Sequence, residues 1–313
     1  MNETARILRI EKISPNDGAG LRTVVFFKGC PMRCRWCSTP ESQKMAPELR
    51  YQAAGCAACG ECAKRCSRKA LSLNRSTGRI VLDKVRCDNC FDCVAACPSG
   101  ALGVYGREMT VSQVMKHIAR DEIFYYHSGG GVTLSGGDVL AQPEFAMALL
   151  MACKDAGLHT AAELNMFGDF EKISGLLPYL DEIYADVKLM DGALHRQWTG
   201  VDNAGILQNI LKAASFCRPG AVHIRTPLIR QVNDSPENIA ATANFCTNLA
   251  SCGELEFLPY HRLGQAAHEH IWRDYPLKDL PAMTSAETRD KVSFLKDKRL
   301  PFPIRVSGET VSN

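Results

Sequence analysis

The sequence predicts an α/β fold built on a parallel sheet. Apolar strand-like runs alternate with amphipathic helix patterns along most of the chain, as right-handed crossovers between parallel strands require. A cysteine-rich segment interrupts this alternation. The 313 residues are enough for one large domain and a small insert. Because six strand units are too few for an eight-stranded barrel, an open doubly wound sheet or a smaller barrel remains.

Six segments carry the predicted strands. The first, Thr23 to Phe27, is continuously apolar, as expected for a strand that is buried on both faces. The others begin at Val132, His159, Glu182, Val222 and Glu254.

Two of the predicted helices begin with a capping box, a Ser or Thr followed three residues later by Glu or Gln. Thr110 and Gln113 open the helix over residues 110–120, whose apolar side chains form one stripe. Thr284 and Glu287 open a helix near the end of the chain.

Two further helices have a proline in their first turn, where its missing N–H does no harm. Pro143 lies at the start of a helix over residues 142–157. Pro236 follows Ser235 in a helix for which we expect Gly253 to be the end.

The loop after the first strand contains Cys30, Cys34 and Cys37, spaced C-x3-C-x2-C. A structural zinc site is closed by four ligands, whereas a reactive metal site keeps one position open. Three thiolates on a 4Fe–4S cluster would leave one iron free to bind a substrate directly. Three core cysteines or a zinc ligand set are the alternative, but core cysteines are seldom clustered in this way.

Eight further cysteines form two runs with the spacing C-x2-C-x2-C-x3-C. Tandem runs of this kind are typical of two-cluster bacterial ferredoxins, in which the fourth cysteine of each run ligates the other cluster. Pro98 follows the second run as in those proteins, whereas Ser67 follows the first. Zinc knuckles are the alternative, although they usually have a longer spacer. We expect one cluster on Cys56, Cys59, Cys62 and Cys97, and another on Cys66, Cys87, Cys90 and Cys93.

The remaining composition narrows the function classes. A net charge of +3 without a dense Lys/Arg block indicates neither nucleic-acid nor membrane-surface binding, and no apolar run is long enough to span a membrane. Residues 1–10 carry charges and no long apolar run, so we expect no secretory signal and a cytoplasmic protein with reduced thiols. We expect the isolated cysteines to be small buried hydrophobes: Cys153, Cys217, Cys246 and Cys252.

Beyond its cysteines, the chain resembles the glycyl-radical-enzyme activating enzymes of the radical S-adenosylmethionine (SAM) superfamily, in the subgroup with a two-cluster ferredoxin insert. The supporting segments run almost from end to end: DGAGLRTVVFFKGCPMRCRWC, GGGVTLSGGD, ADVKLMD and FLPYHRLG. The last is most similar to activators of arylacetate decarboxylases such as 4-hydroxyphenylacetate decarboxylase. The resemblance implies a partial (β/α)6 barrel with an inserted ferredoxin-like module. We expect residues 1–48 to form the first part of the barrel with the cluster loop, 49–104 the insert, and 105–313 the rest of the barrel and a C-terminal segment.

The resemblance also implies an oxidoreductase reaction. Such an enzyme cleaves SAM reductively at the cluster of Cys30, Cys34 and Cys37, and the 5′-deoxyadenosyl radical abstracts hydrogen from a glycine of a partner glycyl radical enzyme. It would carry three 4Fe–4S clusters and receive electrons from a flavodoxin or ferredoxin. A radical SAM enzyme acting on a small molecule would use the same triplet. A ferredoxin-like electron carrier would use only the eight-cysteine module and would leave the triplet unexplained.

Several SAM-binding positions of the family map onto this sequence. Trp36 would pack near the adenine. After Gly136 and Gly137, Asp138 replaces the usual glutamate and would hold the methionine amino group through charge-assisted hydrogen bonds. A helix N-cap is the alternative for Asp138. His261 would lie near the ribose and methionine, with a lone surface histidine as the alternative.

Further positions follow from the strand ends. Asp186 and Lys188 lie on the same face by strand alternation and would contact the SAM carboxylate region, as would Arg225 at the end of the fifth strand. Glu163 occupies the family's acidic position, but Leu-Asn-Met follows it in place of the usual Thr-x-Gly. In the DGAG loop, which borders the peptide entry in the family, Ala19 replaces the usual proline and makes the loop more flexible.

Overall fold

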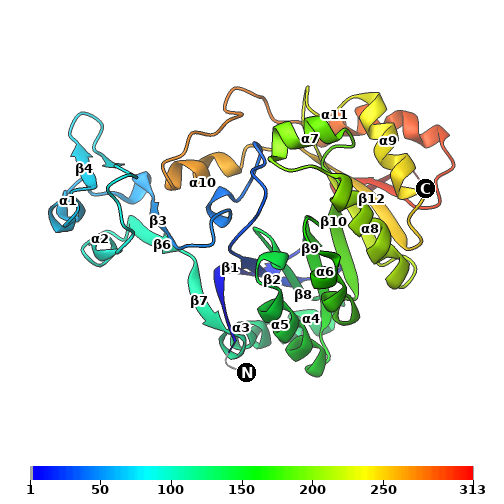
Figure 1. The fold of residues 1–313 in the computed structure, drawn as a ribbon, viewed down its shortest axis with the longest axis horizontal. Coiled ribbons are helices and arrows are strands. Elements are labelled where there is room, and N and C mark those ends of the chain that lie inside the picture. The colour runs from blue at the N-terminus through cyan, green and yellow to red at the C-terminus, as the bar shows by residue number, and fades with distance from the viewer. Residues whose placement is uncertain (1–2, 313) are drawn as a thin grey trace.

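The computed structural model describes residues 3–312. Its main body is a ten-stranded sheet with the strand order β14-β13-β12-β11-β10-β9-β8-β2-β1-β7 (Figure 1). The strands are β1 (Thr4–Ser14), β2 (Arg22–Phe27), β7 (Arg107–Thr110), β8 (Gly131–Gly136), β9 (His159–Leu164), β10 (Glu182–Asp186), β11 (Val222–Leu228), β12 (Cys252–Pro259), β13 (Ile304–Val306) and β14 (Glu309–Ser312).

The six predicted strands are confirmed, and they form the parallel centre of the sheet. Each neighbouring pair from β2 through β8, β9, β10 and β11 to β12 is parallel. Every residue of β2 is buried, which explains its continuous apolar sequence. The chain therefore has the α/β architecture that the alternation of patterns predicts.

The sheet is mixed, which the sequence analysis did not predict. The strand β1 runs antiparallel to both β2 and β7, and β14 runs antiparallel to β13. Seven of the eleven β1 residues lie outside the buried class, so this strand lacks a continuous apolar run. The strands β13 and β14 have only three and four residues, which is too short for a periodic signal.

The helices bear out most of the predicted start signals. Capping boxes at Thr110 and Thr284 begin α3 and α11, and prolines open α5 and α9. The bounds are α3 (Val111–Ile118), α4 (Glu122–Ser128), α5 (Pro143–Asp155), α6 (Phe170–Leu176), α7 (Gly192–Thr199), α8 (Ala204–Phe216), α9 (Pro236–Cys246), α10 (Gly264–His270) and α11 (Ser285–Val292). Short 3-10 turns occur at Pro40–Ser42, Ala53–Gly55, Ala119–Asp121, Val139–Ala141, Leu177–Tyr179 and Ser293–Asp297.

One predicted helix end is wrong. The helix α9 ends at Cys246, and Gly253 lies inside β12. A Cβ at Gly253 would come within 2.3 Å of the Gly220 carbonyl oxygen, so glycine is needed there for a close backbone approach. Gly253 therefore indicates a strand with a close backbone neighbour, and it does not mark the end of a helix.

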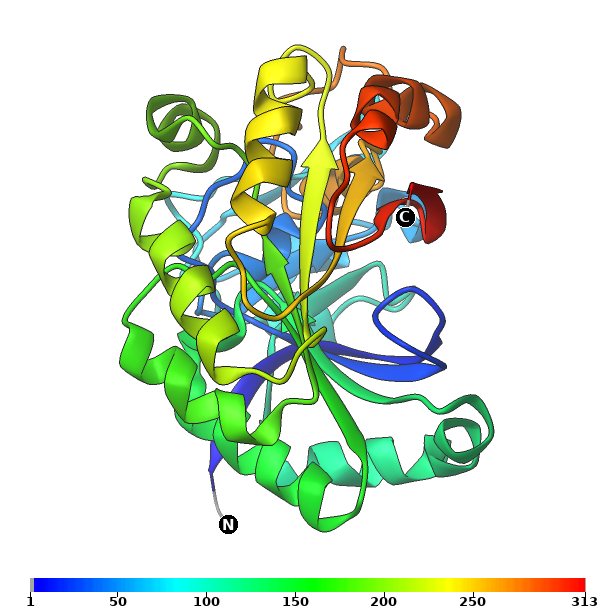
Figure 2. The same ribbon diagram turned by 90° about the vertical axis from the view of Figure 1, so that its right-hand side faces the viewer.

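The apolar core lies between the sheet and its helices (Figure 2). Ile183 and Ala185 of β10 and Ile224 of β11 belong to this core. By strand alternation, Tyr184 and Asp186 point to the opposite face. We call that face the inner face; it carries Glu163, Tyr184, Asp186, His223, Arg225, Glu254 and Glu256.

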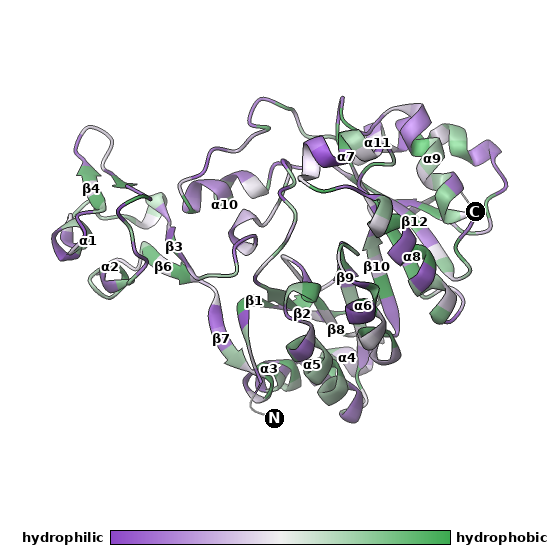
Figure 3. Cartoon of the chain, in the orientation of Figure 1, coloured by the Kyte–Doolittle hydropathy of each residue, from purple (hydrophilic) through white to green (hydrophobic). Residues whose placement is uncertain are grey.

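Hydropathy follows the same division (Figure 3). The central strands are largely hydrophobic, whereas α5 and α8 show both characters, as amphipathic helices that cover a buried sheet require. None of the helices between residues 3 and 312 is long and apolar enough to cross a membrane. Cys153 and Cys246 are buried as expected, whereas Cys217 and Cys252 are only partly buried.

The cysteine-rich segment projects from one side of the sheet body (Figure 1). Antiparallel strands β3 (Glu48–Tyr51) and β6 (Leu102–Tyr105) form its base, and β4 (Leu71–Asn74) pairs with β5 (Arg79–Leu82) farther out. Two short helices, α1 (Glu61–Arg65) and α2 (Asp92–Ala95), complete it. Its buried residues form a small apolar cluster separate from the main core: Leu49, Tyr51, Cys62, Leu71, Ile80, Cys93, Ala101 and Leu102.

Candidate functional site

The cysteine triplet lies in the loop that follows β2, at the carboxyl end of the parallel strands. Backbone hydrogen bonds hold this loop from two sides. The N–H of Cys30 donates to the Gln43 carbonyl at 3.1 Å, and the N–H of Arg33 donates to the Thr199 carbonyl at 2.7 Å. The loop is thus anchored both to the turn before the insert and to the end of α7. Open α/β sheets bind ligands at this edge.

The three triplet thiols share a partly buried environment. Burial raises the pKa of Cys30 and Cys34 to about 12. Burial raises the pKa of Cys37 as well. Coordination to a metal deprotonates a thiol outright, so this all-sulfur set suits a bound iron–sulfur cluster.

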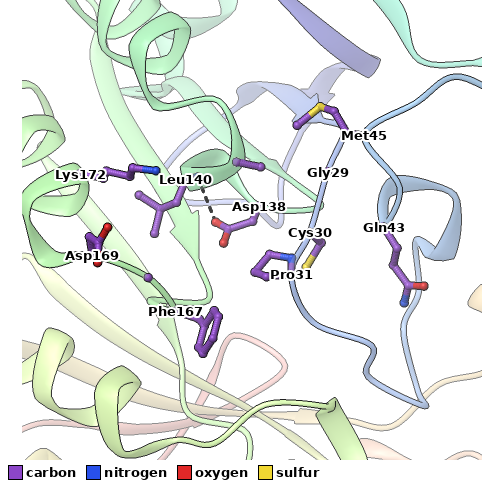
Figure 4. Close-up of a pocket in the computed structure, with 12 residues that line it drawn as sticks. Gly29, Cys30, Pro31, Gln43, Met45, Asp138, Leu140, Phe167, Asp169 and Lys172 are labelled. Carbon is purple, nitrogen blue, oxygen red and sulfur yellow. Dashed lines mark hydrogen bonds between the residues drawn. The ribbon is translucent and has the colours of Figure 1, made fainter.

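A cavity of about 400 Å³ opens beside Cys30 (Figure 4). Sites for small molecules usually enclose about 300–1,000 Å³. The cavity is lined by Gly29, Cys30, Pro31, Gln43, Met45, Asp138, Leu140, Ala141, Phe167, Gly168, Asp169 and Lys172. It therefore combines a triplet sulfur, two carboxylates and an ammonium group with an apolar wall.

Asp138 lies between Leu140 and Cys30 in this cavity (Figure 4). Its side chain is buried, and its Oδ1 accepts the Leu140 N–H at 3.1 Å, so it does cap the turn that follows. Its Oδ2 is buried without a hydrogen-bond partner. Burial raises the pKa of this carboxyl to about 7. The N-cap interpretation is correct for one oxygen and leaves the other available to a ligand.

Gly136 and Gly137 bring Asp138 against the cysteine loop. The N–H of Asp138 donates to the Gly29 carbonyl at 2.8 Å. A Cβ at Gly137 would lie 2.4 Å from that carbonyl oxygen, and one at Gly136 would lie 2.3 Å from the Phe27 nitrogen. Gly136 also has a φ of 116°, which favours glycine. Both glycines are therefore required for the close approach of the two loops.

Asp186 and Lys188 meet as strand alternation predicts. The Lys188 ammonium lies 2.7 Å from the Asp186 carboxylate. Burial alone would lower the pKa of Lys188, but the carboxylate of Asp186 outweighs burial and raises it. Lys188 is therefore a largely buried cation paired with Asp186.

Arg225 differs from its expected position. It lies within β11 rather than at the end of this strand, and it is bound by two carboxylates. Its guanidinium is 2.6 Å from Glu163 and 3.1 Å from Glu256. Ser135 donates a further hydrogen bond to Glu163. This group occupies the inner face, with both Glu163 and Arg225 already paired.

The adjoining DGAG loop contacts the inner face. Thr133 donates to the Asp17 carbonyl at 2.7 Å, and Arg225 donates to the Asn16 carbonyl at 3.2 Å. Arg22 lies 3.4 Å from the Ala19 carbonyl. Side chains of the sheet thus hold the backbone of this loop.

Trp36 and His261 have different environments. Trp36 is buried, and its ring lies 6.3 Å from that of Trp198 in α7. His261 is exposed, and its Nδ1 accepts the Leu263 N–H at 3.3 Å. The exposure of His261 does not decide between a surface histidine and a residue near the ribose, so its role stays a prediction.

Asn165 contacts the triplet at Cys30. The sequence marks this residue only as a departure from a family motif. Its Nδ2 lies 3.7 Å from the sulfur of Cys30. Its Oδ1 accepts the Phe167 N–H at 2.9 Å, which fixes the side chain. Met166 has a φ of 59°, so the chain turns sharply there. An asparagine directly after a predicted strand was the available signal.

The eight insert cysteines surround two cavities. One is lined by Cys56, Cys59, Cys62 and Cys97, and the other by Cys66, Cys87, Cys90 and Cys93. These are the two sets that the ferredoxin spacing predicts. Within residues 3–312, no three His, Cys, Asp or Glu side chains converge as ligands of a single metal ion. A 4Fe–4S cluster instead requires thiolates around a space that its irons and sulfides fill.

Comparison with known proteins agrees with this site. The family model of the radical SAM superfamily matches residues 24–243. The chain is 40% identical to the isethionate sulfite-lyase activating enzyme of Nitratidesulfovibrio vulgaris, covering 88% of this chain and 91% of that protein. It is 38% identical to the indoleacetate decarboxylase activating enzyme of Tractidigestivibacter scatoligenes, and the match covers 90% of this chain and 91% of that protein.

A solved structure supports the fold. The crystal structure of Streptococcus suis SuiB bound to precursor peptide SuiA aligns with 89% of this chain and 46% of that chain, with a TM-score of 0.52 and 12% identity. The long matches to named activators define the family more closely. The chain belongs to the radical SAM superfamily and, within it, to the glycyl-radical-enzyme activating enzymes.

Proposed function

We propose that this protein cleaves SAM reductively beside Cys30, Cys34 and Cys37 and installs a radical on a glycine of a partner glycyl radical enzyme. One observation carries the proposal: Cys30 of the partly buried triplet lines a cavity that also presents the unpaired Oδ2 of Asp138. A 4Fe–4S cluster, when bound by the triplet, supplies one electron. With SAM bound beside it, that electron would break the carbon–sulfur bond and release methionine, and the 5′-deoxyadenosyl radical would take the glycine α-hydrogen.

Asp138 in the cavity and Lys188, which pairs with Asp186, carry charges that match those of SAM. The free oxygen of Asp138 would accept a hydrogen bond from the methionine ammonium, and Lys188 would neutralise the methionine carboxylate. Trp36 and His261 are proposed near the adenosine. Because Glu163 and Arg225 already pair with each other, either would have to exchange its partner to contact SAM.

The proposed architecture is a partial (β/α)6 barrel, in which the six parallel strands surround the inner face. Its first part is residues 1–48 and its remainder is residues 105–313. Residues 49–104 form a ferredoxin-like insert with two more clusters in the cysteine-lined cavities. The protein would thus hold three 4Fe–4S clusters, take electrons from a flavodoxin or ferredoxin, and act in the cytoplasm.

The partner is the open question within this family. The identity to this chain is 40% for the isethionate sulfite-lyase activating enzyme, 38% for the indoleacetate decarboxylase activating enzyme and 35% for the 4-hydroxyphenylacetate decarboxylase activating enzyme. We therefore propose the reaction and leave the choice of glycyl radical enzyme to experiment.

Electron paramagnetic resonance provides the test. Reduced protein, SAM and candidate glycyl radical enzymes are mixed without oxygen, and the radical signal is recorded. A doublet from the remaining α-hydrogen, which collapses when glycine is deuterated, supports the proposal. The variant with Cys30, Cys34 and Cys37 replaced by Ala is the control and should give no radical. Turnover of a small metabolite with SAM cleavage, without any protein radical, would favour the small-molecule alternative.

A further inference from the structure

The helix α10 and the residues that follow it connect the triplet loop to the insert (Figure 1). At its beginning, Gly264 packs against the backbone of Cys37, where an added Cβ would lie 2.4 Å from the carbonyl oxygen. At its end, Trp272 reaches the insert. Residues 264–273, which we call the bridging segment, therefore touch both cysteine-containing parts of the protein.

Trp272 makes a specific contact with the insert. Its ring stacks on Tyr51 with centroids 5.3 Å apart and an interplanar angle of 8°. Its indole N–H donates to the Ile80 carbonyl at 3.0 Å. Tyr51 also accepts the Ile80 N–H at 3.0 Å, so the three residues form one unit. Lys84 donates to the Trp272 carbonyl at 2.6 Å.

This contact leads to one of the two insert cavities. Tyr51 and Ile80 both line the cavity that is surrounded by Cys56, Cys59, Cys62 and Cys97. The bridging segment thus runs from the Cys37 backbone to the wall of this cavity. Aromatic stacking and a directed N–H bond fix both distance and orientation at its far end.

Charged contacts hold the base of the insert in the same place. Arg273 lies 2.9 Å from Glu48, at the start of β3, and also donates to the Pro40 carbonyl at 3.1 Å. The fully buried Lys28 lies 3.2 Å from the other oxygen of Glu48. At the second base strand, Tyr105 and His270 are hydrogen-bonded at 3.0 Å. The bridging segment therefore contacts both strands of the base.

We propose that the bridging segment positions the Cys56, Cys59, Cys62 and Cys97 centre against the triplet centre, and that Trp272 is its main positioning residue for electron delivery. This inference rests on the proposed function, because it requires clusters at both places. With clusters bound, an external low-potential one-electron donor would reduce the insert, and that single electron would pass to the triplet centre. No bond of the protein forms or breaks in this transfer.

Two variants and a control test the inference. Trp272→Ala removes both the stacking and the N–H, whereas Trp272→Phe keeps a ring for stacking. Tyr126→Ala, which removes an aromatic residue that is 83% exposed on α4, is the control. Each reconstituted protein is compared by iron content, by hydrogen exchange of β3 and β6, and by 5′-deoxyadenosine formation. The last is measured with reduced flavodoxin and, separately, with dithionite.

We expect Trp272→Ala to keep its iron but to lose hydrogen-exchange protection in β3. Its flavodoxin-driven rate should fall by about tenfold or more, since small misplacements have large kinetic effects. The dithionite-driven rate should stay at the wild-type value, because a small reductant reaches the triplet directly. Trp272→Phe should recover part of the flavodoxin-driven rate, and Tyr126→Ala should match the wild type.

Two results would overturn the inference: unchanged exchange and unchanged flavodoxin-driven rate in Trp272→Ala, or an equal loss of rate with both reductants. Failure of the proposed function would look different. Either the wild type would cleave no SAM with either reductant, or it would cleave SAM without forming a radical on any partner protein. In both cases the exchange comparison would still decide whether Trp272 holds the insert.

Discussion

Glu163 and Arg225 form an ion pair across the inner face, with 2.6 Å between the carboxylate and the guanidinium. Glu163 belongs to β9 and Arg225 to β11, so the pair spans the intervening strand β10. The guanidinium also lies 4.1 Å from the ring centroid of Tyr184, which belongs to β10. The pair therefore ties three parallel strands together on the face that we assign to the reaction.

The first prediction concerns the pH dependence of this pair. Burial raises the pKa of Glu163 from 4.5 to about 7, although Arg225 opposes the shift. Between these pH values the folded protein binds the proton more tightly than the unfolded chain does. The free energy of unfolding that Glu163 contributes is therefore present at low pH and is lost as the pH rises toward about 7.

Glu163→Gln removes this titration and is the comparison. We expect the melting temperature of the wild type, relative to the variant, to fall with rising pH in that window. Anaerobic thermal unfolding over a pH series measures the difference. A difference that stays constant or rises with pH contradicts the assignment.

The second prediction separates the two roles of Asp138. Asn also caps helices, so Asp138→Asn should retain the turn but lose the charge that we assign to the ammonium of SAM. A hydrogen bond to a charged group contributes about 1.5–3 kcal/mol, so SAM should bind about 10- to 100-fold more weakly. Asp138→Ala should weaken binding similarly and also lower stability by about 1 kcal/mol. Calorimetric titration measures the SAM affinity of each variant, and thermal unfolding measures its stability. If Asp138→Asn bound SAM as tightly as the wild type, the assignment of the Asp138 charge to SAM would be contradicted.

The third prediction concerns the close approach of the two loops. Gly136→Ala should lower stability and impair SAM binding, because its Cβ would collide with the Phe27 nitrogen at 2.3 Å. Gly175→Ala is the matched control: it lies in α6 with nothing within 4 Å of the new Cβ. The control should be neutral or stabilising by up to about 1 kcal/mol. Equal melting temperatures for the two variants would show that the approach is not tight.

The fourth prediction assigns the cysteines. Reconstituted wild type should contain about three 4Fe–4S clusters, given its eleven motif cysteines. Cys62→Ala or Cys90→Ala should disturb the insert while SAM still binds at the triplet. Replacement of Cys30, Cys34 and Cys37 should have the reverse effect. Iron and sulfide analysis, together with SAM-binding measurements, distinguishes the insert variants from the triplet variant. Zinc in place of iron, or a single cluster in the wild type, would contradict the assignment.

The sequence predicted the parts of the fold whose signals are local. The continuous apolar run of β2 and the capping boxes at Thr110 and Thr284 depend on residues close together in the chain, and all three predictions are confirmed. The strand β1 was missed because few of its residues are buried and its charged residues interrupt the apolar pattern. Gly253 was misread because the close approach that requires it comes from Gly220, far away in the sequence.

The residues of the candidate site were likewise predictable only where their signals are local in the sequence. The ferredoxin spacing grouped the eight insert cysteines into the two sets that line separate cavities, and each set takes its fourth cysteine from the other run. Alternation placed Asp186 beside Lys188, which lie two residues apart. The contact of Asn165 with Cys30 joins residues 135 positions apart and left no local signal strong enough to assign it. The contact of Trp272 with Tyr51 is likewise a product of the tertiary fold.

The most direct test of the central claim follows a single hydrogen atom. A candidate glycyl radical enzyme is prepared with α-deuterated glycine and mixed with the reduced protein and SAM without oxygen. Mass spectrometry then measures deuterium in the 5′-deoxyadenosine that forms. The proposed reaction predicts one deuterium per 5′-deoxyadenosine in step with the growth of the protein radical. 5′-Deoxyadenosine that forms with each candidate partner but contains no deuterium would contradict glycine abstraction by this protein.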